Sequence, residues 1–124
     1  MIIKQVSVTV ENKEGKLKEL MDLLSENGIH VEALSMAGTI TRLIVPHPQE
    51  TMDVLADNGY EVHLTDVIRV RIPSKSGSFS KMLVDIAAEK INLEYMYAIP
   101  GGTEMIIRPS DVKRTNELLS DWDD

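Results

Sequence analysis

Two loops in this sequence combine a glycine with polar side chains, and each leads into an apolar pattern with helical spacing. They read ENKEGKL over residues 11–17 and PSKSGSF over residues 73–79. Glycine adopts backbone angles closed to other residues and lets another group approach closely. The first N–H groups of the helix that follows lack partners within it and lie at its positive end, which suits a carboxylate. The chemistry open to these loops is therefore the binding of a small anion or zwitterion.

The first loop also carries a side chain with two kinds of polar group. Asn12 offers an amide donor and a carbonyl acceptor, so it can hold an ammonium or a carboxylate. The alternative is that Gly15 and Gly77 merely permit a tight turn, and the residues alone favour neither interpretation. The candidate ligand-binding residues of the two loops are Asn12, Lys13, Glu14, Gly15, Lys16, Leu17, Ser76 and Gly77.

Residues suited to catalysis or to metal binding are few. The basic catalysts are His30, His47 and His63, and no serine lies in a nucleophile-elbow context. The best pair for a metal is His30 with Glu32 on one face of a predicted strand, but no histidine pair has the tight spacing of zinc sites. We expect no enzymatic activity, no cofactor and no bound metal; a metal-responsive sensor is the weaker alternative.

The composition limits the partners and the compartment. The chain has 124 residues, no cysteine and a formal net charge of −7. An acidic surface repels phosphate backbones and anionic lipids, so neither nucleic acid nor a membrane is expected as a partner. The absence of cysteine excludes disulfides and thiolate metal sites. The chain also lacks the apolar core of a signal peptide and any long apolar run, so we expect a cytoplasmic protein.

An internal repeat organises the elements that must position the two loops. A shift of 62 positions aligns residues 6–45 with residues 68–107 without a gap. Few residues are identical, but the apolar pattern agrees at most positions, and Gly15 coincides with Gly77. We therefore predict two domains, over residues 1–65 and 66–124.

Apolar periodicity predicts the same order of elements in both halves. The elements predicted in the first half are strands over residues 6–10, 29–37, 41–45 and 60–65, a helix with its apolar stripe from Leu17 onward, and a short helix within residues 47–60 that Gly59 ends. In the second half, Ile91, Leu93, Tyr95, Tyr97 and Ile99 recur at every second position and predict one uninterrupted apolar face of the second strand, with Asn92 and Glu94 pointing the other way. The last helix is predicted to start with Ser110 as its N-cap.

The first half thus reads βαββαβ and the second βαββα. This order predicts an α+β protein with two ferredoxin-like repeats, in which antiparallel sheets carry both helices on one face. The second repeat is predicted to lack its last strand.

Several motifs resemble those of ACT domains. The stretches GIHVEALSMA (residues 28–37) and KINLEYMYA (residues 90–98) look like second strands of that family. The ENKEG loop is similar to the ENRPG loop of ACT domains attached to biosynthetic enzymes, although Glu14 stands where the family often has proline. The resemblance covers nearly the whole chain and is greatest to small stand-alone proteins made of two ACT domains in tandem.

The resemblance implies a sensor of small molecules, because ACT domains commonly bind amino acids at the seam between two domains. In the family, the Asn of ENxxG and the Asn of xNI usually contact the ligand. These positions fall here on Asn12 and Asn92, whose counterparts in the other repeat are Ser74 and His30. The second side of the seam implied in this way consists of His30, Asn92, Leu93 and Tyr95.

We therefore expect a non-catalytic regulatory protein that binds an amino acid or a similar small metabolite at the seam between ACT domains. A homodimer is expected, because symmetric pairing covers exposed sheet edges or helical faces most simply. The alternative is a ligand-free interaction module that dimerises, fills its seams by packing and recruits a metabolic enzyme.

Overall fold

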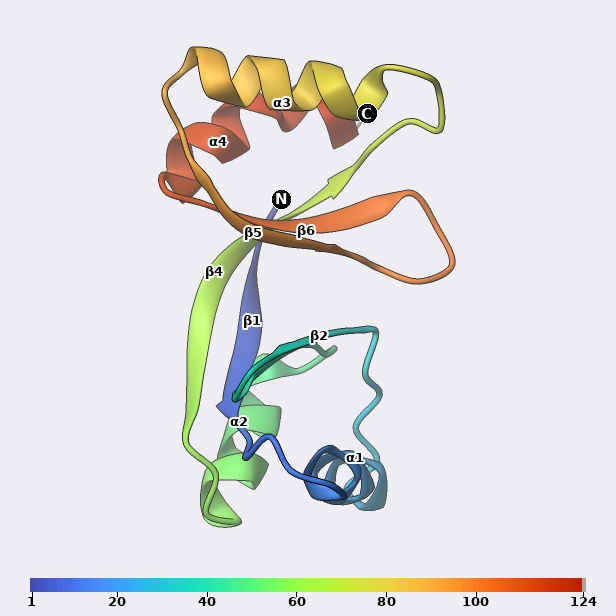
Figure 1. Cartoon of the computed structure of the whole chain (residues 1–124), viewed down its shortest axis with the longest axis vertical. Helices are drawn as coiled ribbons and strands as arrows, with labels where there is room; N and C mark the ends of the chain where they lie inside the picture. Colours follow the sequence, from blue (N-terminus) through green and yellow to red (C-terminus); the bar gives the residue numbers. More distant parts are fainter. Residues whose placement is uncertain (124) are drawn as a thin grey trace. The chain divides into compact units, whose positions relative to one another are not determined.

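The computed structural model describes residues 1–123, and these form two compact units. The first unit comprises Lys4–Thr65, and the second comprises Met1–Ile3 together with Asp66 and the residues that follow it. None of the described helices is long and apolar enough to cross a membrane. The elements shown in Figure 1 are β1 (Ile2–Thr9), α1 (Lys16–Glu26), β2 (Ala33–Ala37), β3 (Ile40–Ile44), α2 (Pro48–Asp57), β4 (Val62–Arg71), α3 (Ser78–Ala88), β5 (Leu93–Ala98), β6 (Glu104–Pro109), α4 (Val112–Leu118) and a short 3-10 helix, η1 (Ser120–Asp123).

The first unit is an antiparallel sheet with α1 and α2 packed against it. Its strand order is β2-β3-β1 followed by the first residues of β4. Val6 of β1 lies opposite Leu43 of β3, and the Thr9 N–H donates to the Glu61 carbonyl at 3.0 Å. The apolar residues of the strands and helices recur at the period of each element, so they lie on the faces that meet in one core. This core consists of Val6, Val8, Val10, Leu20, Leu24, Leu43, Val45 and Leu55.

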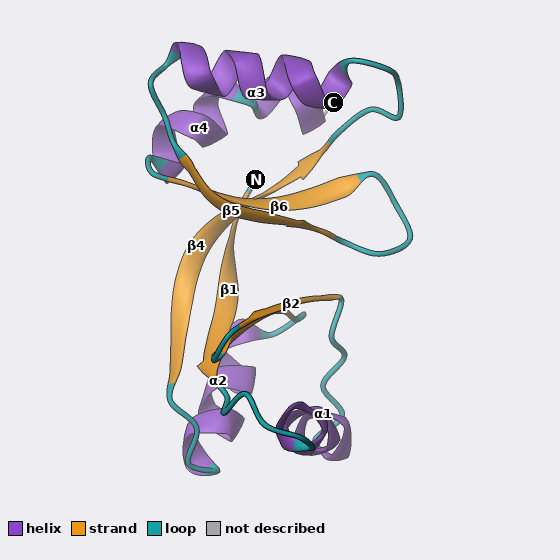
Figure 2. Ribbon diagram, viewed as in Figure 1, coloured by secondary structure: helices purple, strands orange, loops and turns teal. Residues whose placement is uncertain are grey.

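The second unit repeats this arrangement with β5, β6 and the later residues of β4. Figure 2 shows α3 and α4 over the same face of its sheet. No fourth strand follows α4 in the described residues, and the start of the chain lies on the other side of β4. There Met1 and Arg69 exchange two hydrogen bonds, of 3.1 Å from the terminal amine and 2.9 Å from the Arg69 N–H, as an antiparallel pair does. The core consists of Ile68, Val70, Ile72, Met82, Ile86, Ile107 and Leu119.

The predicted α+β class, the two ferredoxin-like repeats and the missing last strand of the second repeat are confirmed. Strand β4 runs unbroken from Val62 to Arg71 and belongs to both repeats. Its first residues are the fourth strand of the first repeat, and its later residues are the first strand of the second. The division into domains at residue 65 stays a prediction.

The gapless alignment of the two halves is wrong for the third strands. Val6 pairs with Leu43, whereas its equivalent Ile68 pairs with Ile107, so the shift here is 64 residues rather than 62. The reason is the hairpin. Two residues, GT, lie between the paired Ala37 and Ile40 in the first repeat, whereas four, PGGT, lie between Ile99 and Glu104, whose carbonyl accepts the Ile99 N–H, in the second. Loop length fixes the register of the strands in a hairpin. The two extra residues therefore change the offset between equivalent residues of the two repeats from 62 to 64 after the loop.

The predicted second strands are too long, and the predicted apolar face of the second copy is wrong. Strand β2 begins at Ala33 and β5 at Leu93. The pairing of β5 with β6 shifts between Leu93 and Tyr95, as at a β-bulge. A bulge reverses the inward and outward positions beyond it, so that Met96, rather than Tyr95 or Tyr97, packs with Leu93 against the core.

The predicted N-cap of the last helix is wrong by one residue. Asp111 is the N-cap of α4, and its Oδ1 accepts the Arg114 N–H at 3.0 Å. Ser110 instead exchanges two hydrogen bonds with Asn92, since its Oγ accepts the Asn92 N–H at 3.0 Å and its N–H donates to the Asn92 carbonyl at 2.8 Å. Ser110 thus ties the start of α4 to the start of β5.

An ion pair links β4 and β6 and makes the stability of the protein depend on pH. Arg69 donates to both carboxylate oxygens of Glu104, at 2.9 and 3.0 Å. These hydrogen bonds lower the pKa of the Glu104 carboxyl below its ordinary value of 4.5. A lowered folded-state pKa stabilises the protein fully above the unfolded pKa, and this contribution is lost as the pH falls through the folded pKa.

We therefore predict that Glu104→Gln destabilises the protein at pH 7 and that the difference from wild type shrinks below about pH 4.5. The side chains are partly exposed, so the difference at pH 7 should not exceed about 1 kcal/mol. Urea unfolding between pH 7 and pH 3 measures it, with Glu26→Gln at the exposed end of α1 as the control. A difference of equal size at both pH values would contradict the prediction.

Candidate functional site

The first loop joins β1 to α1 and is exposed from Glu11 to Gly15. Gly15 is the N-cap of α1 with φ +79°, and no side chain of the described residues caps the helix. The turn is closed by the backbone, because the Lys16 N–H donates to the Lys13 carbonyl at 3.2 Å and the Glu19 N–H to the Gly15 carbonyl at 3.0 Å. The other amides of the first helical turn lack acceptors within the helix, as a bound carboxylate requires.

The second loop has the same backbone geometry. Gly77 is the N-cap of α3 with φ +86°. The Ser78 N–H donates to the Lys75 carbonyl at 3.2 Å, and the Lys81 N–H donates to the Gly77 carbonyl at 2.9 Å. Both glycines therefore form the tight turn that is one interpretation of the sequence. Since the backbones agree, the two loops differ in their side chains, with Asn12 in the first and Ser74 in the second.

The lysines of the first loop are paired with carboxylates at the surface. Lys13 Nζ lies 3.3 Å from a Glu11 carboxylate oxygen, and Lys16 Nζ lies 3.5 Å from that of Glu19. All four side chains are exposed enough to be screened by water, so each pair contributes little to stability. The positive potential at the loop therefore comes mainly from the helix end.

The two predicted sides of the site lie at opposite ends of one helix in each unit. The first loop precedes α1 and His30 follows it, and α1 has 11 residues. At 1.5 Å per residue the helix separates them by about 16 Å. Gly77 and Asn92 are separated in the same way by α3, which also has 11 residues. A small ligand that touches both sides must therefore contact two domains.

The structure brings Asn12 to Leu17 together on one loop but does not place the second-strand candidates on one face. Asn92 is exposed, Leu93 packs against the core of the second unit, and Tyr95 lies on the other side of the strand because of the bulge. Asn92 and Tyr95 are thus better placed than Leu93 to contact a bound molecule. Ser76 and Gly77 lie together at the start of α3.

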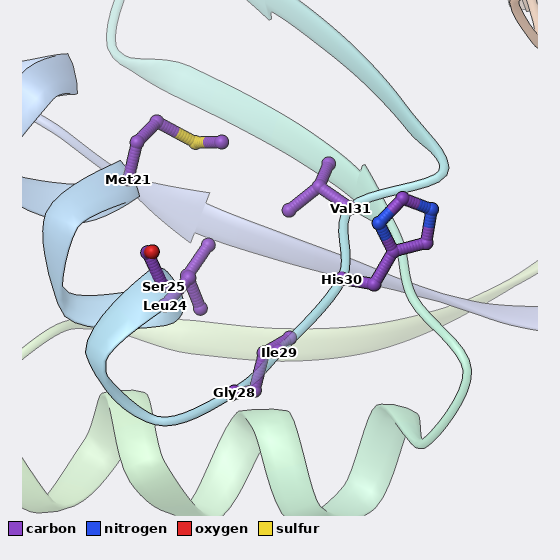
Figure 3. Close-up of a pocket in the computed structure, with 7 residues that line it drawn as sticks. All are labelled: Met21, Leu24, Ser25, Gly28, Ile29, His30 and Val31. Carbon is purple, nitrogen blue, oxygen red and sulfur yellow. The ribbon is translucent and has the colours of Figure 1, made fainter.

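A pocket of about 410 Å³ that the sequence analysis missed lies beside α1 in the first unit. In Figure 3, Met21, Leu24 and Ser25 of α1 face the segment that leads to β2. Gly28, Ile29, His30 and Val31 form that segment. Met21 has the helical spacing of a core residue, so only the structure could show that it lines an open pocket. The predicted site residue His30 lies in this pocket rather than near the first loop.

A second pocket, of about 260 Å³, lies on the far side of His30, between the end of α1 and the start of α2. Its lining includes His30, His47 and Glu50. No group of three or more His, Cys, Asp or Glu side chains within residues 1–123 could hold a metal ion. In the second unit the corresponding place is bridged, since Arg114 donates to Glu89 at 2.7 Å.

One buried hydroxyl in the first unit has no partner. Thr41 of β3 is fully buried, and its Oγ1 makes no hydrogen bond to any described residue. Thr41 lies opposite Val8, a core residue, and paired residues share one face of a sheet. The hydroxyl is therefore directed into the core near the end of β1 that leads to the first loop.

The fold and the two glycine loops define a protein built of two ferredoxin-like domains in tandem. The family model of the ACT domain pair matches residues 1–121. The chain therefore belongs to the ACT domain pair family.

Solved structures share the fold. Protein BT0572 from Bacteroides thetaiotaomicron is 34% identical, with a TM-score of 0.90, and the match covers 98% of this chain and 88% of that chain. The regulatory subunit of aspartate kinase from Thermus flavus shares the fold at 14% identity, with a TM-score of 0.65 and coverage of 98% and 94%. E. coli aspartokinase III in complex with lysine and aspartate (T-state) shares it at 10% identity, with a TM-score of 0.59 and coverage of 98% and 31%. The comparison with curated proteins finds no match.

The left-handed backbone at Gly15 predicts that any side chain at this position destabilises the protein. No described heavy atom lies within 4 Å of the Cβ that Gly15→Ala would add, so only the φ of +79° opposes it. We expect a loss of about 1 kcal/mol in the free energy of unfolding. The control is Gly102→Ala, at an equally open position whose φ is not left-handed. Urea titration followed by circular dichroism measures both, and equal losses would refute this account.

The buried Thr41 hydroxyl, which has no hydrogen-bond partner among the described residues, predicts a stabilising substitution. Thr41→Val keeps the shape of the side chain and removes a buried polar group without a partner. Such a group costs roughly 1–3 kcal/mol, so the variant should unfold at higher urea concentration than wild type. Thr115→Val is the control, because the Thr115 Oγ1 donates to the Asp111 carbonyl at 2.7 Å and its loss should destabilise the protein. Destabilisation by both substitutions would show that the Thr41 hydroxyl has a partner in solution.

Proposed function

We propose that this protein is a non-catalytic regulatory protein that binds an amino acid or a similar small metabolite. The observation that carries the proposal is a pair of helix-starting glycine turns of equal geometry in a chain of the ACT domain pair family. The proposed site has the first loop, Asn12 to Leu17, as one of its sides. The protein acts in the cytoplasm as a homodimer and needs no cofactor.

The first loop supplies groups of both signs for a zwitterion. The carboxylate of the ligand binds the backbone N–H groups near Gly15 and Lys16, at the positive end of α1. The ammonium group binds the side-chain carbonyl of Asn12. Glu14 makes the loop less rigid than a proline would, so part of the binding free energy is spent on ordering it.

The second side of the site comes from the second-strand region of another ACT domain, since about 16 Å of helix separates the two regions within one domain. Asn92 and Tyr95 are the proposed contacts there. A ligand held in this way touches two domains and therefore favours one packing of them over another. The fold-level likeness to aspartokinase III, solved with lysine and aspartate, supports an amino acid as the ligand by analogy.

The alternative function is a ligand-free interaction module that recruits a metabolic enzyme. The exposed apolar residues of α3, among them Phe79 and Val84, favour a binding surface of some kind. This alternative predicts that substitution of Asn12 changes nothing, because no ligand occupies the first loop.

Thermal unfolding in the presence of each of the twenty amino acids tests the proposal. A ligand at 100 times its dissociation constant should add about 2.7 kcal/mol, a clear rise in melting temperature. Asn12→Ala should remove the rise, whereas Ser74→Ala, at the equivalent position of the second loop, should keep it. The proposal fails if no amino acid at millimolar concentration stabilises the wild-type protein, or if Asn12→Ala responds as wild type does.

A further inference from the structure

Each unit has a junction where the end of its first helix lies beside the start of its second. Helices α1 and α3 correspond at a shift of 62 residues, and Asn27 and Glu89 are their C-caps. After the hairpins the shift is 64, so α2 corresponds to α4, and the buried Thr51 falls on the buried Thr115. The two junctions can therefore be compared residue by residue.

Three sets of side-chain interactions close the junction of the second unit. Arg114 Nη2 donates to a Glu89 carboxylate oxygen at 2.7 Å and so bridges the two helices. Asp111 caps α4, because its Oδ1 accepts the Arg114 N–H at 3.0 Å. Ser110 exchanges two hydrogen bonds with Asn92, which follows α3. A guanidinium group of the chain itself therefore spans this junction.

The junction of the first unit has no such bridge. Glu50 stands at the position of Arg114, and Asn27 stands at the position of Glu89. The cation is thus replaced by an anion, and the carboxylate that it bonds is replaced by a neutral amide. The Glu50 side chain is exposed and forms no ion pair within the described residues. The junction therefore keeps groups that accept hydrogen bonds and lacks the cation that would donate to them.

The other two closures are also absent from the first unit. His47 replaces Asp111, and α2 has no side-chain cap within the described residues. Pro46 replaces Ser110 and offers neither a hydroxyl nor an N–H. What remains between the helices is the open pocket of about 260 Å³, whose lining includes Asn27, His30, Pro46, His47, Glu50 and Thr51.

Three side chains of this pocket have an oxygen that is open to a donor. The Glu50 carboxylate only accepts, and Asn27 uses its amide N–H to bond the Leu23 carbonyl at 2.8 Å, which leaves its Oδ1 as an acceptor. Thr51 is 1% exposed, and its hydroxyl makes no hydrogen bond to the described residues. Since a buried hydroxyl without a partner costs free energy, a ligand that donates to it is favoured.

The charges around the pocket favour a cation. The end of α1 and the start of α2 carry partial charges of about half a unit each and of opposite sign, so they offset one another. Glu50, in the first turn of α2, adds a full negative charge. Among the described residues, no lysine or arginine lines the pocket. The net potential of the lining is therefore negative.

We propose that this pocket binds the ammonium or guanidinium group of a small molecule, in the place that the Arg114 guanidinium has in the second unit. The Glu50 carboxylate pairs with the cation, and the Asn27 carbonyl and the Thr51 hydroxyl accept further hydrogen bonds from it. Pockets for drug-sized ligands have about 300–1,000 Å³, so about 260 Å³ suits a smaller molecule. The pocket lies at the opposite end of α1 from the first loop and is a second site, which does not depend on the ligand proposed there.

Titration of the wild-type protein with methylguanidinium chloride at pH 8, followed by NMR of the backbone amides, tests the site. The amides of residues 27–30 and 50–51 should shift and reach saturation at millimolar concentration. N-methylurea, which has the same shape and no charge, is the control and should bind about tenfold more weakly. The absence of saturable shifts at these amides, or equal binding of the two compounds, overturns the inference.

Glu50→Gln tests the charge, because it keeps the shape of the side chain and removes the anion that pairs with the ligand. The dissociation constant for methylguanidinium should rise about tenfold. Asp57→Asn removes one negative charge at the other end of α2 and should leave the dissociation constant within about a factor of two. A Glu50→Gln variant that binds methylguanidinium as tightly as wild type overturns the inference.

Transfer of the bridge from the second unit tests whether the ligand takes the place of a guanidinium. The double variant Asn27→Glu with Glu50→Arg gives the first unit the pair that Glu89 and Arg114 form in the second. It should no longer bind methylguanidinium, and retained binding overturns the inference. Asn12→Ala, in the first loop, should bind methylguanidinium as wild type does, so this site and the first-loop proposal are tested separately.

Discussion

Backbone pairing along the first strand of each repeat is the constraint on which the structure depends. A ferredoxin-like sheet needs a neighbour on both sides of that strand, because an unpaired edge leaves a row of N–H and C=O groups exposed. The first repeat meets this need with the beginning of β4, and the Thr9 N–H donates to the carbonyl of Glu61, the residue before β4. The second repeat has no fourth strand of its own in the described residues, and Met1 bonds to Arg69 in its place. The first three residues of the chain, Met1–Ile3, therefore belong to the second unit.

The sequence predicts what depends on local pattern and misses what depends on pairing between distant residues. The alternation of apolar residues is enough to predict the order of elements and the buried faces of the first strands. The two equivalent glycines are enough to predict the turns before α1 and α3. The bulge near Tyr95 and the longer second hairpin break the repeat, because register follows the pairing of whole strands. The pairing of Met1 with Arg69 is a contact across 68 residues that no periodicity reveals. The pocket at Met21 was missed for a related reason, since a core position and a pocket wall have the same helical spacing.

The two repeats share the same backbone arrangement but differ in side chains at the two ends of α1 and α3. Each helix starts at the same left-handed glycine turn, but the first repeat has Asn12 in the loop where the second has Ser74. At the other end of the helices, a pocket beside His30 corresponds to a junction that Arg114 bridges. Since the fold tolerates either chemistry at each end, these positions are free to be used for binding. The proposed site uses this difference, because Asn12 gives the first loop a side-chain amide that the second loop lacks.

Contact with two domains has a thermodynamic consequence. If the ligand contacted a single domain, it would bind equally well whatever the packing of the domains and could not change that packing, however tightly it bound. Regulation requires contacts that differ between two packings, and the length of α1 provides this condition, because a ligand on the first loop reaches a second-strand region only in another domain. Coupling is also reciprocal: the factor by which the ligand favours one packing equals the factor by which that packing tightens ligand binding.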